Sequence, residues 1–243
     1  IRDRYYDLAK QALAEYDDLD LIVWPESCFP IGAARIPGPP DAPAEFRYET
    51  GLPWFVVEDG LLEPPPNAPA DFAERLRSIN ERAQFWTRET LSELARPYLR
   101  LDGSRRRTHP SYVIGVGLVA YGPHPPARYN SALHFSRWGR LEQRYDKTSP
   151  VAFGEYIPLG DFFPWLYSLT PLGGGLTEGK GPQAFSVAGR YFSPNICFES
   201  TLPSLIRSQV AELNSSARRP DALLNITNDG WFWGSSILDI HLA

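Results

Sequence analysis

The sequence predicts an α/β fold, and three observations support that prediction. Helical and strand-like hydrophobic patterns alternate along the 243 residues. The content of 43% hydrophobic and 22% charged residues is that of a globular domain with a sizeable core. No internal repeat and no convincing linker divides the chain. We therefore expect helices and strands packed in layers around one core.

Composition excludes several classes of function. The net charge of −5 gives no electrostatic reason to bind a phosphate backbone, so no nucleic-acid partner is expected. No apolar run reaches the roughly 20 residues that a membrane-spanning helix requires. The two cysteines are too few for a disulfide scaffold, and the four histidines lack zinc-type spacing. We therefore predict no metal site and no cofactor.

The first half of the chain is predicted to hold two helices and one strand. Residues 5–16 place apolar side chains at helical spacing, and the short apolar run at residues 19–24 is typical of a buried strand. Prolines then cluster over residues 30–69, where we expect a surface excursion with little regular structure. Helical spacing returns over residues 72–96.

The second half is predicted to be mostly strands. A turn at Arg137-Trp-Gly-Arg joins two of them, and a helix is expected between the last two. The six predicted strands cover residues 112–120, 131–135, 141–145, 184–187, 191–197 and 222–227.

Three predicted strand ends carry residues suited to chemistry. Glu26, Lys147 and Cys197 each lie where a strand finishes, and α/β folds gather their sites at strand ends. The lysine is informative because only three of the 24 basic residues are lysines and the other 21 are arginines. Unlike arginine, lysine offers a compact ammonium that can lie against a developing oxyanion.

Each of these residues also has an ordinary interpretation. A cysteine that ends an apolar strand is usually a small core residue, and the glutamate and lysine could simply face water. Their joint occurrence favours chemistry instead. A cysteine nucleophile needs a base to remove its proton and a cation or donor beside the oxygen that becomes negative. Glu26, Lys147 and Cys197 supply one of each.

The sequence around these residues resembles the carbon–nitrogen hydrolase, or nitrilase, superfamily. Within it, the apolipoprotein N-acyltransferase branch is the most similar, because Lys147 leads into Phe-Gly-Glu-Tyr-Ile-Pro-Leu and Glu199 stands two residues after Cys197. The resemblance implies a nitrilase-like α-β-β-α sandwich, with a single domain over residues 1–243 that is truncated at both ends. It rests on Tyr145-Asp-Lys-Thr-Ser-Pro-Val-Ala-Phe-Gly-Glu155-Tyr-Ile-Pro-Leu, Ile196-Cys-Phe-Glu199 and Asn225-Ile-Thr-Asn-Asp-Gly-Trp-Phe.

The resemblance also implies a mechanism. Glu26 would be the general base, Cys197 the nucleophile and Lys147 the cation beside the oxyanion. Cys197 would take a fatty acyl chain from a phospholipid as a thioester and pass it to the N-terminal diacylglyceryl cysteine of an apolipoprotein. The residues implied to bind substrate or support the site are Glu155, Glu199, Asn130, Phe198 and Trp231.

The family further implies a place in the cell. The enzyme would act at the bacterial inner membrane with this domain on the periplasmic face, attached through segments outside this sequence. The aromatic group at residues 162–167 has two open interpretations, since these rings either pack in the core or dip into the membrane interface.

Two other functions fit the same residues. One is a soluble nitrilase-family amide or nitrile hydrolase, in which water replaces the amine as the acceptor. The other is a non-catalytic lipoprotein-binding module, which would require the three groups not to be assembled into one site.

Overall fold

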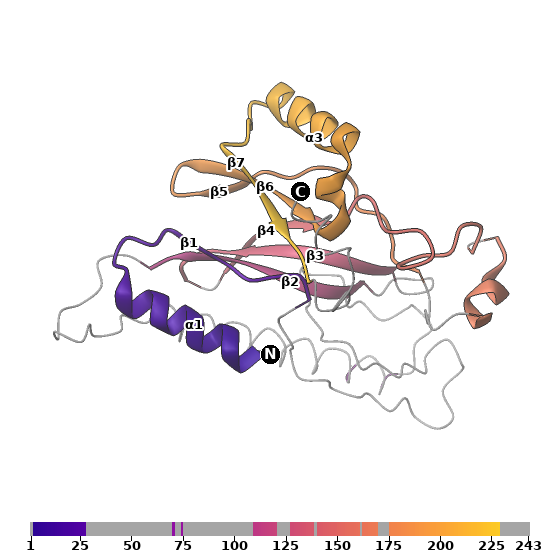
Figure 1. Cartoon of the computed structure of the whole chain (residues 1–243), viewed down its shortest axis with the longest axis horizontal. Helices are drawn as coiled ribbons and strands as arrows, with labels where there is room; N and C mark the ends of the chain where they lie inside the picture. The colour runs from indigo at the N-terminus through magenta and orange to yellow at the C-terminus, as the bar shows by residue number, and fades with distance from the viewer. Residues whose placement is uncertain are drawn as a thin grey trace.

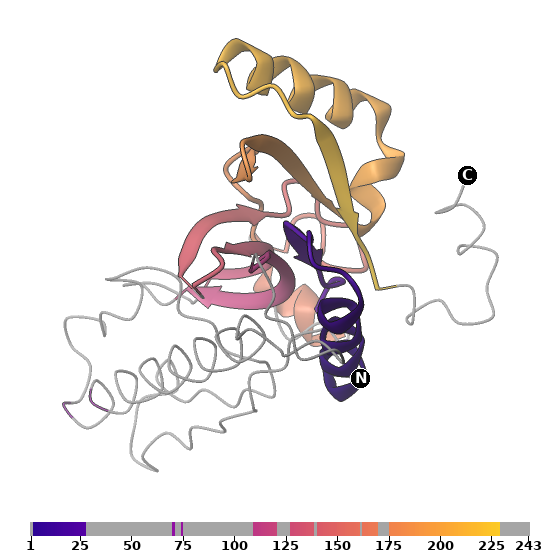
Figure 2. The same cartoon turned by 90° about the vertical axis from the view of Figure 1, so that its left-hand side faces the viewer.

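Two β-sheets lie face to face between two helices. The computed structural model describes residues 2–27, 70, 74, 109–120, 127–138, 140–160, 162–169 and 175–228. Helix α1 (Arg2–Glu15) lies against a four-stranded sheet, and α3 (Pro203–Ser215) lies on the far side of a three-stranded sheet (Figures 1 and 2). This layer order confirms the predicted α-β-β-α architecture.

The four-stranded sheet follows the order β1-β2-β3-β4 and packs against α1. Strand β1 (Leu21–Val23) runs parallel to β2 (Ser111–Ala120), which continues antiparallel to β3 (Ala127–Phe135) and β4 (Leu141–Asp146). Alternate residues of β2 and β3 point toward the helix, as the two-residue period of a strand requires. The core on this side consists of Ala9, Leu13, Trp24, Tyr112, Ile114, Val116, Leu118, Leu133 and Phe135.

The three-stranded sheet follows the order β5-β6-β7. Strand β5 (Phe185–Val187) is antiparallel to β6 (Arg190–Ile196), and β6 is parallel to β7 (Ala222–Ile226). Its apolar face meets the opposite side chains of the first sheet. This second core, between the sheets, consists of Val113, Ala132, Tyr145, Phe185, Ile196, Cys197 and Ile226.

Most predicted elements are present, with differences at their ends. Strand β3 begins at Ala127, four residues before the prediction, because residues 127–130 pair with β2 although Ala127 and Asn130 are residue types that strands disfavour. The predicted excursion at residues 30–69 lies outside the described residues, as does nearly all of the predicted helix at residues 72–96.

Two features are absent from the described residues. In the ranges given above, no helix combines the length and apolar character needed to cross a bilayer. The same ranges contain no group of three or more histidine, cysteine or carboxylate side chains arranged to hold a metal ion.

Candidate active site

Glu26 follows the end of β1 and lies 7% exposed between the two sheets. The Asn130 side-chain Nδ2 donates to its Oε1 at 2.5 Å, and the backbone N of Asn228 donates to its Oε2 at 3.0 Å. Burial raises the pKa of Glu26, and these hydrogen bonds and the charge of Lys147 offset that rise only in part. The carboxylate is therefore a stronger base than an exposed glutamate.

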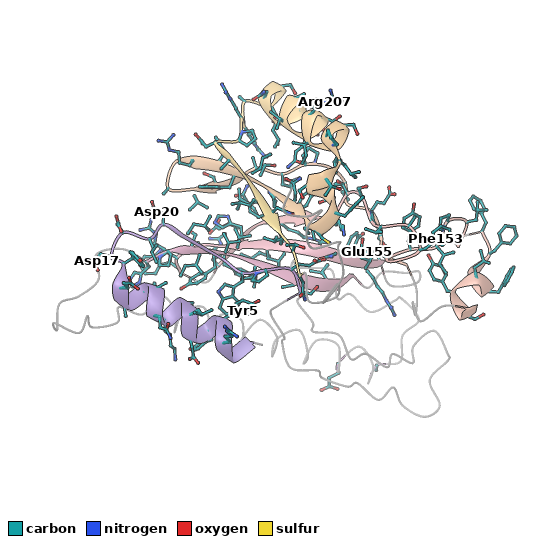
Figure 3. All side chains as sticks on the ribbon, viewed as in Figure 1. Tyr5, Asp17, Asp20, Phe153, Glu155 and Arg207 are labelled. Carbon is teal, nitrogen blue, oxygen red and sulfur yellow. The ribbon has the colours of Figure 1, made fainter. Side chains whose placement is uncertain are left out.

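Lys147 comes directly after β4 and is 1% exposed. Its Nζ donates to Glu155 Oε1 at 2.8 Å, while the other oxygen of Glu155 accepts from the backbone N of Val151 at 2.7 Å. The backbone N of Lys147 donates to the carbonyl of Asn130 at 2.8 Å. The ammonium is thus held at the end of the sheet, where Figure 3 labels Glu155.

Cys197 stands at the sharp turn from β6 into the short 3-10 helix η3 (Cys197–Thr201). Its φ of 56° lies in the left-handed region, which non-glycine residues rarely adopt and which clusters at functional sites. Burial and the nearby charge of Glu26 raise the pKa of Cys197, whereas Lys147 and hydrogen bonds from Thr227 and the Phe198 backbone lower it. The net rise keeps the group a thiol at neutral pH, so attack requires a base.

Glu199 lies fully buried two residues after the cysteine. Its Oε1 accepts from the Thr148 backbone N at 2.7 Å, the Thr148 hydroxyl at 3.0 Å and the Ser149 backbone N at 2.9 Å. Its Oε2 accepts from the Tyr145 hydroxyl and the Ile196 backbone N, both at 2.8 Å. Glu199 therefore joins the loop after Lys147 to the turn that carries Cys197.

The structure brings the three predicted groups together from three separate strand ends. The charges of Glu26 and Lys147 both act on the pKa of Cys197, and the charges of Lys147 and Glu155 act on the pKa of Glu26. Cys197 forms no disulfide. The arrangement places a base, a cation and a thiol at the same end of the sandwich.

One match to a family model establishes the family of the chain. The family model described as carbon-nitrogen hydrolase matches residues 3–242. The chain belongs to the carbon-nitrogen hydrolase family. This membership confirms the resemblance inferred from the sequence, and the layer order described above agrees with it.

Several curated relatives of this carbon-nitrogen hydrolase are named apolipoprotein N-acyltransferase. The one from Rhodopirellula baltica is 30% identical over 98% of this chain and 39% of its own length. The one from Bdellovibrio bacteriovorus is 25% identical over 96% of this chain and 33% of its own length. This chain thus spans about two fifths or less of these relatives. Among solved structures, an amidase from Nesterenkonia sp. is 15% identical, with a TM-score of 0.48 over 100% of this chain and 65% of that one.

The other predicted site residues lie in different environments from one another. Asn130 is buried and donates to Glu26, whereas the Phe198 side chain, next to Cys197 in sequence, is exposed. Trp231 lies outside the described residues. Sequence reasoning assigned no role to Thr227 or Asn228, although both follow the end of β7 and so satisfy the strand-end rule that identified the other three.

A row of exposed apolar side chains lies on the segment that follows Lys147. We call Phe153, Leu159, Phe162, Phe163 and Trp165 the aromatic surface, since each is at least half exposed and Phe162 is 80% exposed. The segment, which includes the 3-10 helix η2 (Pro164–Leu169), extends beyond the end of the sheets in Figure 1. For Phe162, Phe163 and Trp165 the core-packing interpretation is therefore wrong, whereas Leu166 and Tyr167 are half-buried.

Proposed function

We propose that this chain is the catalytic domain of an N-acyltransferase that works through a thioester on Cys197. The observation that carries the proposal is the meeting of Glu26, Lys147 and Cys197 in one buried cluster. The relatives' name, apolipoprotein N-acyltransferase, supports acyl transfer to an apolipoprotein. We propose a phospholipid as the acyl donor and the N-terminal diacylglyceryl cysteine of an apolipoprotein as the acceptor.

In the first half-reaction, Glu26 takes the thiol proton while the sulfur of Cys197 attacks the ester carbonyl of the phospholipid. The carbonyl oxygen becomes negative beside the Lys147 ammonium, whose position is held by Glu155. The carbon–oxygen bond then breaks, the leaving alkoxide takes the proton from Glu26, and lysophospholipid departs. The acyl group remains on the sulfur.

In the second half-reaction, the acceptor amine attacks the thioester carbonyl and Glu26 takes the amine proton. The new carbon–nitrogen bond forms, the carbon–sulfur bond breaks, and the proton returns to the sulfur. A single base serves both halves, so the buried and weakly solvated carboxylate of Glu26 suits the mechanism. Two half-reactions through one covalent intermediate give ping-pong kinetics.

The aromatic surface supports a lipid partner. Aromatic rings favour the interface between headgroups and acyl chains, and a monomeric protein rarely leaves such a group exposed without a function. The segment also begins directly after Lys147, so a bilayer that contacted it would bring acyl chains near the site. We place the domain on the periplasmic face of the bacterial inner membrane, attached through segments outside this sequence.

Thioester trapping tests the function. The chain is incubated with phospholipid vesicles or with small amides, and the reaction is quenched in acid. Mass spectrometry then measures the mass of the protein, with Cys197→Ala as the control. We expect a mass gain of one fatty acyl group on Cys197 with phospholipid alone. A gain with the amides alone would indicate the hydrolase, and no gain with either would favour the lipoprotein-binding module.

Vesicle flotation tests the lipid partner separately. Serine replaces Phe162 and Trp165 together, and in the matched control it replaces Trp138, which is 72% exposed in the turn between β3 and β4. We expect the double variant to lose several-fold in the bound fraction and Trp138→Ser to bind as the parent does. Equal binding by all three chains would remove the membrane role of this surface.

A further inference from the structure

Strand β2 carries two glycines on the face that points between the sheets. Val113 on this strand packs in the inter-sheet core, whereas Ile114 and Val116 pack toward α1. Because side chains alternate along a strand, Gly115 and Gly117 share the inter-sheet face with Val113. Both glycines therefore leave the inner face of β2 bare beside the active site.

The two glycines differ in what lies above them. A Cβ atom at Gly115 would stand 2.4 Å from the carbonyl oxygen of Pro25 and 2.5 Å from the Cα of Glu26. These are backbone atoms, which cannot rotate away as the end of a side chain could. A Cβ atom at Gly117 would meet no atom within 4 Å in the part of the chain that the structure describes.

The close approach at Gly115 follows from the pairing of β1. Val23 is the last residue of β1 and pairs with Val113, after which the Trp24 backbone N still donates to the Val113 carbonyl at 2.8 Å. The chain then crosses above Gly115 and delivers Glu26 to Asn130, which lies on the neighbouring strand β3. The absence of a side chain at Gly115 thus determines how closely the backbone of Pro25 and Glu26 approaches β2, and with it the position of the Glu26 carboxylate.

We propose that Gly115 is a positioning residue of the active site. Because it has no side chain, the backbone of Pro25 and Glu26 can lie close to β2, which places the Glu26 carboxylate where it can take a proton. The inference rests on the proposed role of Glu26 as the general base. Proton transfer requires donor and acceptor atoms about 2.6 to 3.2 Å apart. A displacement of about 1 Å can cost two orders of magnitude in rate.

The test compares Gly115→Ala with Gly117→Ala in the whole chain. The substitutions are chemically identical and lie two residues apart on one face of one strand, with Gly115 opposite Ala132 and Gly117 opposite Asn130. Only at Gly115 does the backbone of Pro25 and Glu26 lie directly above the new methyl group. We expect Gly115→Ala to slow thioester formation from phospholipid by about 100-fold. We expect Gly117→Ala to stay within about two-fold of the parent, since its methyl group meets no atom of the described residues within 4 Å.

A second readout does not depend on catalysis. The pH midpoint for alkylation of Cys197 by iodoacetamide reports on the charged groups around the thiol, which are Glu26 from the end of β1, and Lys147 with its partner Glu155 from the end of β4. Glu199 shares the turn with Cys197 and is enclosed by its own five donors. Moving the Glu26 carboxylate away lowers the midpoint, so Gly115→Ala should shift it in the same direction as Glu26→Gln. Gly117→Ala should leave it unchanged.

A double-mutant cycle completes the test. If Gly115 acts through Glu26, adding Gly115→Ala to Glu26→Gln produces no further change in rate or midpoint. Additive effects, equal behaviour of the two alanine variants, or a Gly115→Ala chain that no longer unfolds cooperatively would overturn the inference, since the glycine would then serve the sheet. If the parent forms no thioester, the proposed function fails while the alkylation midpoints still decide the role of Gly115.

Discussion

Two buried glutamates lie near Cys197, and their surroundings differ. Glu199 accepts five hydrogen bonds from Tyr145, Thr148, Ser149 and Ile196. Within the described ranges, Glu26 accepts two, from Asn130 and from the Asn228 backbone. A carboxylate has about four lone-pair sites, so Glu199 is saturated and Glu26 retains capacity to take a proton.

The difference in hydrogen bonding links Glu199 to the stability of the fold and leaves Glu26 available for the reaction. The donors to Glu199 come from β4 and the loop after it and from Ile196, the last residue of β6, so the charge links two segments that are distant in sequence. Burial also raises the pKa of Tyr145, with Glu199 contributing, so its hydroxyl remains a donor. We therefore expect changes at Glu199 to affect folding most and changes at Glu26 to affect the reaction most.

The largest effect is expected for Glu26→Gln. The amide keeps the shape of the side chain and cannot accept the thiol proton, so thioester formation should slow by about 1000-fold. Its thermal midpoint should fall by a few degrees, because the amide keeps one of the two oxygens that accept from Asn130 and Asn228 and replaces the other with an NH2 group. Glu178→Gln, at an exposed position, is the matched control and should react normally. A decrease of less than ten-fold in the rate of thioester formation would show that Glu26 is not the base.

The next largest effect is expected for Glu199→Ala. Two buried and three partly buried donors lose their acceptor, which should lower the free energy of unfolding by about 3 kcal/mol. Urea denaturation measures this change, with Glu178→Ala as the control for loss of an exposed glutamate. A change under about 1 kcal/mol would show that water satisfies these donors equally well, and the contrast between the two glutamates would fail.

A smaller effect is expected for Glu155→Gln. The charge of Glu155 raises the pKa of Glu26, so its removal should lower that pKa. Because the reaction needs ionised Glu26, the acid limb of the pH profile for thioester formation should move to lower pH. Glu178→Gln should leave the limb in place. A shift to higher pH would mean that Glu155 acts on the base mainly by positioning Lys147.

The smallest effect concerns stability and pH. Folding raises the pKa of Glu26 above its ordinary value of 4.5, so the folded chain holds this proton more tightly than the unfolded chain. The resulting stabilisation is fully present below about pH 4.5 and is lost as the pH rises through the folded-state pKa. The unfolding free energy of Glu26→Gln should therefore increase relative to that of the parent as the pH rises from 4.5 to 7. Denaturant titrations at several pH values measure the difference, and a gain toward low pH would contradict the sign.

The sequence predicted the parts of the fold that depend on local pattern. A short apolar run rich in valine indicated β2, and helical spacing indicated α1. The start of β3 was predicted too late because Ala127 and Asn130 are residue types that strands disfavour, which outweighed the strand preference of Tyr129. Pairing with an already formed strand supplied what local preference lacked.

Residue type and position at strand ends were enough to select Glu26, Lys147 and Cys197 as candidates, because each chemistry needs a particular functional group. Their distances and partners depend on contacts between remote segments. Asn130 meets Glu26 across 104 positions, and Asn228 meets it across 202. Gly115 matters only because another strand brings backbone directly above it. No local pattern encodes such a contact, since it exists only once the sheets have closed on each other.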